Sequence, residues 1–109
     1  MEKIFLDILK PDDWHVHLRE GETLSSVLPF TYENFRSALI MPNLDTPITN
    51  ISLAENYYNE ICKQIPRGIE FTPNMTLYLT NHLSKDEIKK VSTHKYIKAI
   101  KMYPKGATT

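Results

Sequence analysis

The feature that most constrains the fold is a regular alternation between short apolar segments and longer segments whose apolar residues have helical spacing. The apolar segments recur roughly every 25 to 35 residues, which is the spacing of successive βα units. Strands that are separated by helices pair in parallel, and the crossovers between them are right-handed. The pattern therefore predicts an α/β fold built on a parallel sheet.

Five segments have the length and composition of strands, and prolines or polar clusters bound them. Alternation of apolar and polar side chains is clearest in the fourth segment, whereas the third is almost continuously apolar, which is typical of a parallel strand buried on both faces. We predict strands over residues 4–9, 13–18, 37–43, 71–80 and 96–103.

Three segments between these strands have helical periodicity. The first covers residues 23–28, and Pro29 is expected to end it. The second covers residues 52–65, where one apolar stripe includes Cys62 as a packed thiol, and the third begins near residue 84. Capping boxes are expected at two helix starts, formed by Ser52 with Glu55 and by Ser84 with Glu87.

The order of these elements leaves two architectures open. Four strands after the leading one can form a small open sheet, or they can be the first half of a (β/α)₈ barrel. A complete barrel needs roughly 250 residues, whereas the chain has 109. In both architectures, the chemistry is found at the carboxyl ends of the strands.

Composition excludes several classes of partner. Basic and acidic residues both number 13, so the formal net charge is zero and the chain has no excess charge for nucleic acid or an anionic membrane surface. The longest apolar run, residues 38–41, is far shorter than the about 20 residues of a transmembrane helix. Cys62 is the only cysteine, which excludes an internal disulfide and suits the cytoplasm, the expected location.

Two histidines lie at the end of the second predicted strand. His15 and His17 are two residues apart, so in a strand both side chains project from the same face. Two neutral imidazoles held in this way are a natural half-site for zinc. They are not a complete site, because a catalytic zinc takes three protein ligands and a water. The alternative is a pair of structural histidines; His82 and His94 are expected to be ordinary surface residues.

Three further polar residues lie near predicted strand ends. Arg19 continues the face of the two histidines if the strand persists, and its fork of donors suits a carboxylate. Asn43 follows the third strand, and Lys101 lies between apolar residues in the last one. If Lys101 points inward, its pKa falls, and a neutral amine can take up carbon dioxide as a carbamate. A surface arginine and a solvated lysine are the alternatives.

Four motifs, in order, carry a resemblance to a known family. The first, PDDWHVHLREG, joins the histidine pair to Arg19 and is the most specific. The others are MPNL with Pro47, FTPNMTLYLT at residues 71–80, and KMYP followed by ATT at residues 101–109. Together they span nearly the whole chain, which resembles the N-terminal portion of the bacterial homodimeric type of dihydroorotase, in the amidohydrolase superfamily.

The resemblance implies that residues 1–109 are the N-terminal half of a metal-dependent (β/α)₈ hydrolase barrel that interconverts N-carbamoyl-L-aspartate and L-dihydroorotate in pyrimidine biosynthesis. His15 and His17 would bind metal, and Lys101, once carboxylated, would bridge two zinc ions that polarise the ring amide and activate a water. By the same resemblance, Arg19 and Asn43 would hold the substrate carboxylate, and Thr108 and Thr109 would begin a loop that closes on substrate in some members of the family.

The resemblance also implies what this stretch lacks. Family members have two more metal-binding histidines and an aspartate that serves as general base, all on later strands. We therefore expect residues 1–109 to need the remaining part of the barrel, to be inactive without it, and to form a homodimer when complete. Two other interpretations stay open: another cyclic-amide hydrolase of the dihydropyrimidinase or allantoinase type, and a small non-catalytic α/β metal-binding domain.

Overall fold

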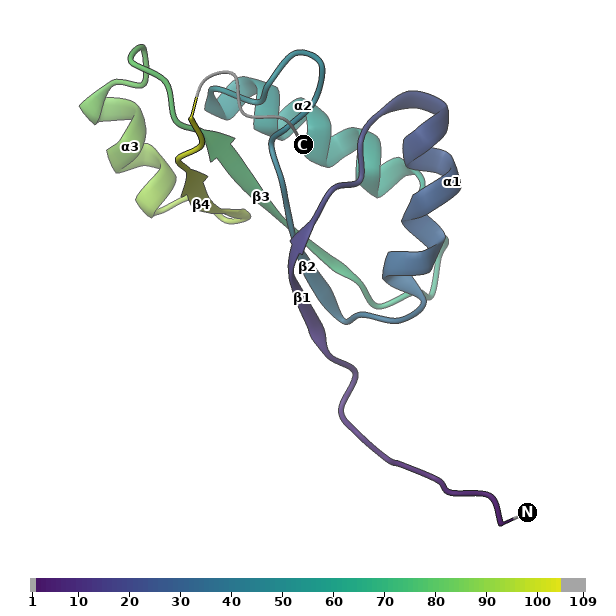
Figure 1. The fold of residues 1–109 in the computed structure, drawn as a ribbon. Helices are drawn as coiled ribbons and strands as arrows, with labels where there is room; N and C mark the ends of the chain where they lie inside the picture. The colour runs from purple at the N-terminus through teal and green to yellow at the C-terminus, as the bar shows by residue number, and fades with distance from the viewer. Residues whose placement is uncertain (1, 105–109) are drawn as a thin grey trace.

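The computed structural model describes residues 2–104, which form one parallel sheet and the helices that connect its strands (Figure 1). The elements alternate without exception in the order strand, helix, strand. They are β1 (Asp12–Val16), α1 (Gly21–Tyr32), β2 (Ser37–Ile40), α2 (Ile51–Lys63), β3 (Thr72–Tyr78), α3 (Lys85–Ser92) and β4 (Ile97–Lys101). The α/β alternation predicted from the sequence is therefore confirmed.

The strands lie in the sequential order β1-β2-β3-β4, and each neighbouring pair is parallel. A doubly wound sheet reverses its strand order at a switch point, whereas a barrel adds every strand on the same side. No reversal occurs among the strands of residues 2–104, so the order is that of consecutive barrel strands.

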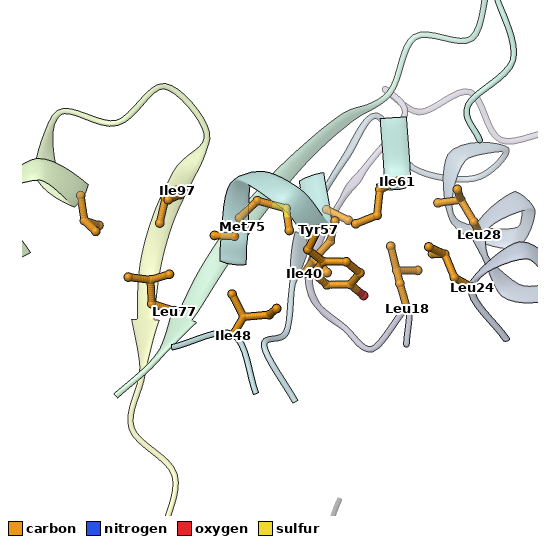
Figure 2. Close-up of a cluster of buried hydrophobic side chains, with 13 residues drawn as sticks. Leu18, Leu24, Leu28, Ile40, Ile48, Tyr57, Ile61, Met75, Leu77 and Ile97 are labelled. Atoms are coloured by element: carbon orange, nitrogen blue, oxygen red, sulfur yellow. The ribbon is translucent and has the colours of Figure 1, made fainter. Parts of the chain in front are cut away.

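One face of the sheet carries the hydrophobic core, and all three helices contribute to it (Figure 2). Leu24 and Leu28 come from α1, Ile61 from α2 and Val91 from α3. They pack with strand residues such as Leu77, which is completely buried. Because parallel crossovers share one hand, a sequential strand order places every helix on this face.

The opposite face of the sheet is open in the described part of the chain. Trp14 is 76% exposed there, and Leu39 is only half-buried. These two side chains line a hollow of about 370 Å³ together with Asp12, Asp13, Ser37, Asn74 and Lys98. The prediction that the strand at residues 37–43 is buried on both faces is therefore wrong for residues 2–104, since only the helical face is covered.

The leading strand predicted at residues 4–9 does not form. The segment is extended and leaves the sheet, with Ile4 94% and Leu9 90% exposed (Figure 1). An apolar, alternating sequence becomes a strand only when a neighbour supplies hydrogen bonds and cover. No strand in the described chain lies beside this segment.

Four helix ends differ from the predictions, since α1 begins at Gly21 and not at residue 23, and α2 ends at Lys63 and not at residue 65. Helix α1 runs through Pro29 to Tyr32, because Leu28 and Thr31 on either side of the proline are buried. Burial of these side chains outweighs the loss of one helical hydrogen bond at the proline. Helix α2 begins at Ile51, one residue earlier than predicted.

The capping of α2 differs from the predicted box. The Asn50 side chain accepts the backbone N–H of Leu53 at 2.8 Å, so Asn50 is the cap in place of Ser52. Glu55, the predicted partner of Ser52, instead contacts His94 on the α3–β4 connection. Only the Ser84 half of the box predicted on α3 is confirmed: its hydroxyl accepts the backbone N–H of Glu87 at 3.1 Å, whereas the Glu87 carboxylate accepts the backbone N–H of Ile51.

His94 is not the ordinary surface residue that the sequence indicated. Its Nε2 lies 3.1 Å from a Glu55 carboxylate oxygen, and its Nδ1 accepts the backbone N–H groups of Tyr96 and Ile97. The imidazole thus ties α2 to the start of β4. His82, in contrast, is exposed as predicted, and Cys62 is half-buried.

Candidate active site

The predicted site residues collect where the strands end. His17 follows directly after the last residue of β1, and Lys101 is the last residue of β4. Asn43 lies three residues beyond the end of β2. Because the strands are parallel, these positions share the carboxyl edge of the sheet, where barrel enzymes place their catalytic groups.

The two histidines converge on one point. Their Nε2 atoms lie 3.2 Å apart, and their ring centroids are separated by 5.2 Å. The register of β1 against β2 shifts between Asp13 and Val16, just before the second histidine. Asp13 supports the strand by accepting the backbone N–H of His15 at 3.0 Å.

Arg19 is not an extension of β1, which ends at Val16, so the expected continuation of the histidine face is wrong. The residue has a φ of 57°, which turns the chain toward α1. Its side chain nevertheless reaches the site, where Nη1 donates to the backbone carbonyl of Asn43 at 2.9 Å.

Asn43 connects the arginine to the lysine. Its backbone carbonyl accepts from Arg19, and its side-chain Oδ1 accepts from Lys101 Nζ at 2.7 Å. Since the Asn43 Oδ1 atom is occupied in this way, the NH₂ group of the same amide can donate to an anion. Lys101 also lies 4.7 Å from the ring centroid of Tyr103.

The cluster contains basic side chains and lacks an acidic partner for them within residues 2–104. Burial lowers the pKa of His17, and the neighbouring Arg19, Lys101 and His15 lower it further. Burial also lowers the pKa of Lys101, with Arg19 as the second cause. Within residues 2–104, neither Arg19 nor Lys101 forms an ion pair with a carboxylate. The site therefore favours a neutral His17 imidazole, a less strongly charged lysine and an anionic ligand.

Sequence reasoning missed one residue at this edge. Tyr57 of α2 is buried with the apolar side chains of its helix, but its hydroxyl donates to the backbone carbonyl of Arg19 at 2.6 Å. A buried tyrosine usually finds a hydrogen-bond partner. The sequence indicates that a partner is needed but does not identify one 38 residues away.

Comparison with known proteins shows which proteins this chain resembles. Dihydroorotase from Acaryochloris marina is 46% identical over 104 residues, and the aligned region covers 95% of this chain and 30% of that protein. Dihydroorotase from Picosynechococcus is 49% identical over all 109 residues, or 31% of its length. This chain is homologous to dihydroorotases. It spans about 30% of the length of these curated relatives, and no model of a protein family matches it.

Solved dihydroorotases share the fold. The structure from Campylobacter jejuni superposes with a TM-score of 0.82 at 35% identity and covers 92% of this chain, which matches 28% of that chain. The Saccharomyces cerevisiae structure, in complex with 5-fluoroorotic acid, gives 0.80 at the same identity and covers 91% of this chain and 27% of its own. The prediction of a portion of a dihydroorotase barrel is thus confirmed.

The histidine pair fits one half of the metal centre expected of dihydroorotases. Two nitrogens that each lie about 2.0–2.1 Å from a tetrahedral ion are about 3.3–3.4 Å apart, close to the Nε2 separation observed here. His17 Nδ1 is buried and has no hydrogen-bond partner in residues 2–104. The same residues hold no cluster of three or more His, Cys, Asp or Glu side chains that could bind a metal.

Two predicted features remain to be placed. Thr108 and Thr109, expected to bind substrate as in dihydroorotases, lie outside the described residues. None of the helices within residues 2–104 has both the length and the apolar character needed to cross a membrane.

Proposed function

We propose that this chain forms the N-terminal portion of a dihydroorotase barrel and supplies part of its active site. The reaction is the reversible hydrolysis of the cyclic amide of L-dihydroorotate to N-carbamoyl-L-aspartate, a step of pyrimidine biosynthesis. One observation carries the proposal: in a chain homologous to dihydroorotases, five polar residues come together at the carboxyl edge of the sheet. They are His15, His17, Arg19, Asn43 and Lys101.

The imidazoles and the lysine are assigned to the metal centre. His15 and His17 would hold one zinc ion through their convergent Nε2 atoms, and a carboxylated Lys101 would be shared between two zinc ions. Addition of carbon dioxide to the neutral Lys101 amine forms a carbamate and releases a proton. When bound, the metal ions supply Lewis-acid polarisation of the amide carbonyl and activation of water.

Arg19 and Asn43 are assigned to the substrate carboxylate. The guanidinium uses Nη1 to hold the Asn43 carbonyl, and its remaining N–H groups are available for a carboxylate. The Asn43 amide adds a neutral donor beside it. Arg19 neutralises the carboxylate and both residues orient the substrate, so their contribution is chiefly positional. Thr108 and Thr109 are assigned to the same binding function.

The rest of the active site is assigned to polypeptide outside this sequence. The chain is about 30% of the length of its relatives, and a catalytic zinc needs more ligands than the two histidines offered here. We place the remaining metal ligands and the general base on later strands of the same barrel domain, with the complete protein a homodimer in the cytoplasm. One relative, from rice, is described as mitochondrial.

The discriminating experiment compares Arg19→Ala with wild type in the complete protein that carries this chain. Hydrolysis of dihydroorotate is measured beside that of dihydrouracil, which lacks the carboxylate. The wild type is expected to prefer dihydroorotate. In Arg19→Ala, the loss of charge-assisted hydrogen bonds should lower kcat/KM for dihydroorotate roughly 10- to 150-fold. The preference for dihydroorotate over dihydrouracil should therefore become smaller.

Arg67→Ala is the matched control, because Arg67 is exposed and lies on the α2–β3 connection, away from the carboxyl edge. It should leave both activities within about twofold of wild type. A wild-type protein that hydrolyses both substrates equally well, or an Arg19→Ala variant that loses both activities in equal proportion, would contradict the proposal.

A further inference from the structure

The backbone of Arg19 has an unusual conformation. It is the only non-glycine residue in residues 2–104 with a positive φ, 57°. This left-handed region is unfavourable for residues with a Cβ atom and is mainly occupied by glycine. Gly21, two residues later, also has a positive φ of 59° and begins α1. The β1–α1 turn therefore needs two left-handed residues, and only one of them is glycine.

The positive φ of Arg19 lies where two consecutive side chains go to different parts of the structure. Leu18, just before Arg19, is 1% exposed and packs in the core, whereas the Arg19 side chain reaches Asn43 at the edge of the sheet. A sparsely populated backbone conformation persists only where the surrounding structure fixes it, and such residues cluster at functional sites. Something in the structure must therefore hold the Arg19 backbone in place.

Tyr57 provides that contact. Its hydroxyl donates to the Arg19 backbone carbonyl at 2.6 Å, while Nη1 of the same arginine donates to the Asn43 carbonyl at 2.9 Å. Arg19 is thus held at its backbone by α2 and at the tip of its side chain by the segment that follows β2. Two elements distant in sequence thus hold the residue whose guanidinium is assigned to the substrate carboxylate.

The tyrosine is itself firmly placed. It is 5% exposed, and Figure 2 shows its ring among the buried side chains of the core. Burial raises the pKa of its hydroxyl far above the usual value, and Glu20 raises it further, so the hydroxyl remains a donor. A phenylalanine at this position would fill the same space and keep the packing, but the Arg19 carbonyl would lose its partner.

We propose that Tyr57 is a positioning residue for substrate binding: its hydroxyl holds the left-handed backbone of Arg19 and so aims the guanidinium at the substrate carboxylate. The inference rests on the proposed function of Arg19. Tyr57 itself touches neither substrate nor metal in this scheme, and its effect passes entirely through Arg19.

The test is a double-mutant cycle in the complete protein with Tyr57→Phe, Arg19→Ala and the double variant. Tyr57→Phe should raise KM for dihydroorotate about 5- to 10-fold and leave kcat within about twofold, because uniform binding is lost and the chemical step is not. In the Arg19→Ala background, the same change should have no further effect on KM, since the two residues act as one unit.

Tyr58→Phe is the matched control on the same helix, because the Tyr58 ring stacks on Tyr96 with centroids 3.7 Å apart and does not reach Arg19. It should leave KM unchanged. A crystal structure of the Tyr57→Phe protein gives a readout that is independent of activity: Arg19 should leave the positive-φ region or lose its contact with Asn43.

The outcomes separate the two proposals. If Arg19→Ala leaves KM for dihydroorotate unchanged, the carboxylate-binding role of Arg19 is wrong, whatever Tyr57 does. If Arg19→Ala raises KM but Tyr57→Phe does not, or if their effects multiply in the double variant, the positioning role of Tyr57 is wrong. A Tyr57→Phe crystal structure in which Arg19 keeps both its positive φ and its contact with Asn43 would also overturn it.

Discussion

Asp12 links the first two strands through hydrogen bonds at the amino end of the sheet. Its carboxylate accepts from Arg36 Nε at 3.2 Å, from Arg36 Nη2 at 2.8 Å and from Ser37 Oγ at 2.7 Å. The hydrogen bonds from Arg36 and then from Ser37 lower the pKa of Asp12 below its ordinary value of 3.8. The residue lies at the opposite end of the strands from the candidate site, so its effect is on stability.

The pH dependence of unfolding should report this carboxylate. A depressed folded-state pKa stabilises the protein above the ordinary pKa, and the stabilisation is lost as the pH falls through the lowered value. The free energy of unfolding should therefore decrease as the pH drops below about 4. Asp12→Asn should make this decrease shallower. Urea titrations at a series of pH values measure this; parallel profiles for the two proteins would contradict it, and high salt should shrink the difference.

At the scale of elements, the helix starts show how neighbouring units share capping groups. Asn50 caps α2 through the Leu53 N–H, and the Glu87 carboxylate of α3 accepts the backbone N–H of Ile51 at 2.9 Å. The backbone N–H groups in the first turn of α2 thus find acceptors both in the adjoining sequence and in the next βα unit. Such sharing ties consecutive units together beyond the strand pairing.

Removal of the α2 cap tests this assignment. Asn50→Ala should lower the free energy of unfolding by about 1 kcal/mol, the usual cost of losing an N-cap. Ser52→Ala, the control at the position that the sequence pattern favoured, should change it by less than about 0.5 kcal/mol. Urea denaturation of both variants decides between them, and a larger loss for Ser52→Ala would restore the predicted capping box.

At the scale of the whole molecule, stability comes from a core on one face of the sheet. Leu77 lies in β3, between two neighbouring strands, and is completely buried beneath the helices. The other face, with Trp14 exposed, adds no comparable cluster within residues 2–104. Core substitutions should therefore affect the fold as a unit, and substitutions on the open face should not.

Leu77→Ala should lower the free energy of unfolding by roughly 2–5 kcal/mol, since it leaves a cavity in a close-packed interior. Leu79→Ala is the control of the same chemistry just beyond the strand, where the side chain is 40% exposed, and it should cost less than about 1 kcal/mol. Equal losses in thermal or urea unfolding would contradict the placement of Leu77, and not Leu79, in the core.

The sequence by itself determined the elements and the order of the site residues. Period-two and helical spacing depend on local geometry, so the four sheet strands and the three helices were predictable, and strand alternation placed His15 and His17 together. The positions of Asn43 and Lys101 at strand ends followed from the rule that parallel strands share a carboxyl edge. Their assigned roles remain predictions.

Tertiary structure decided what depends on partners distant in sequence. Residues 4–9 have a strand pattern but no neighbour, Pro29 stays within α1 because its flanking residues are buried, and Asn50 takes the cap predicted for Ser52. The left-handed backbone of Arg19 and its contact with Tyr57 have no local signature, because a hydrogen bond across 38 residues forms only once helix and turn have packed. Local periodicity encodes elements, whereas the aim of a side chain is set by the packing of those elements against one another.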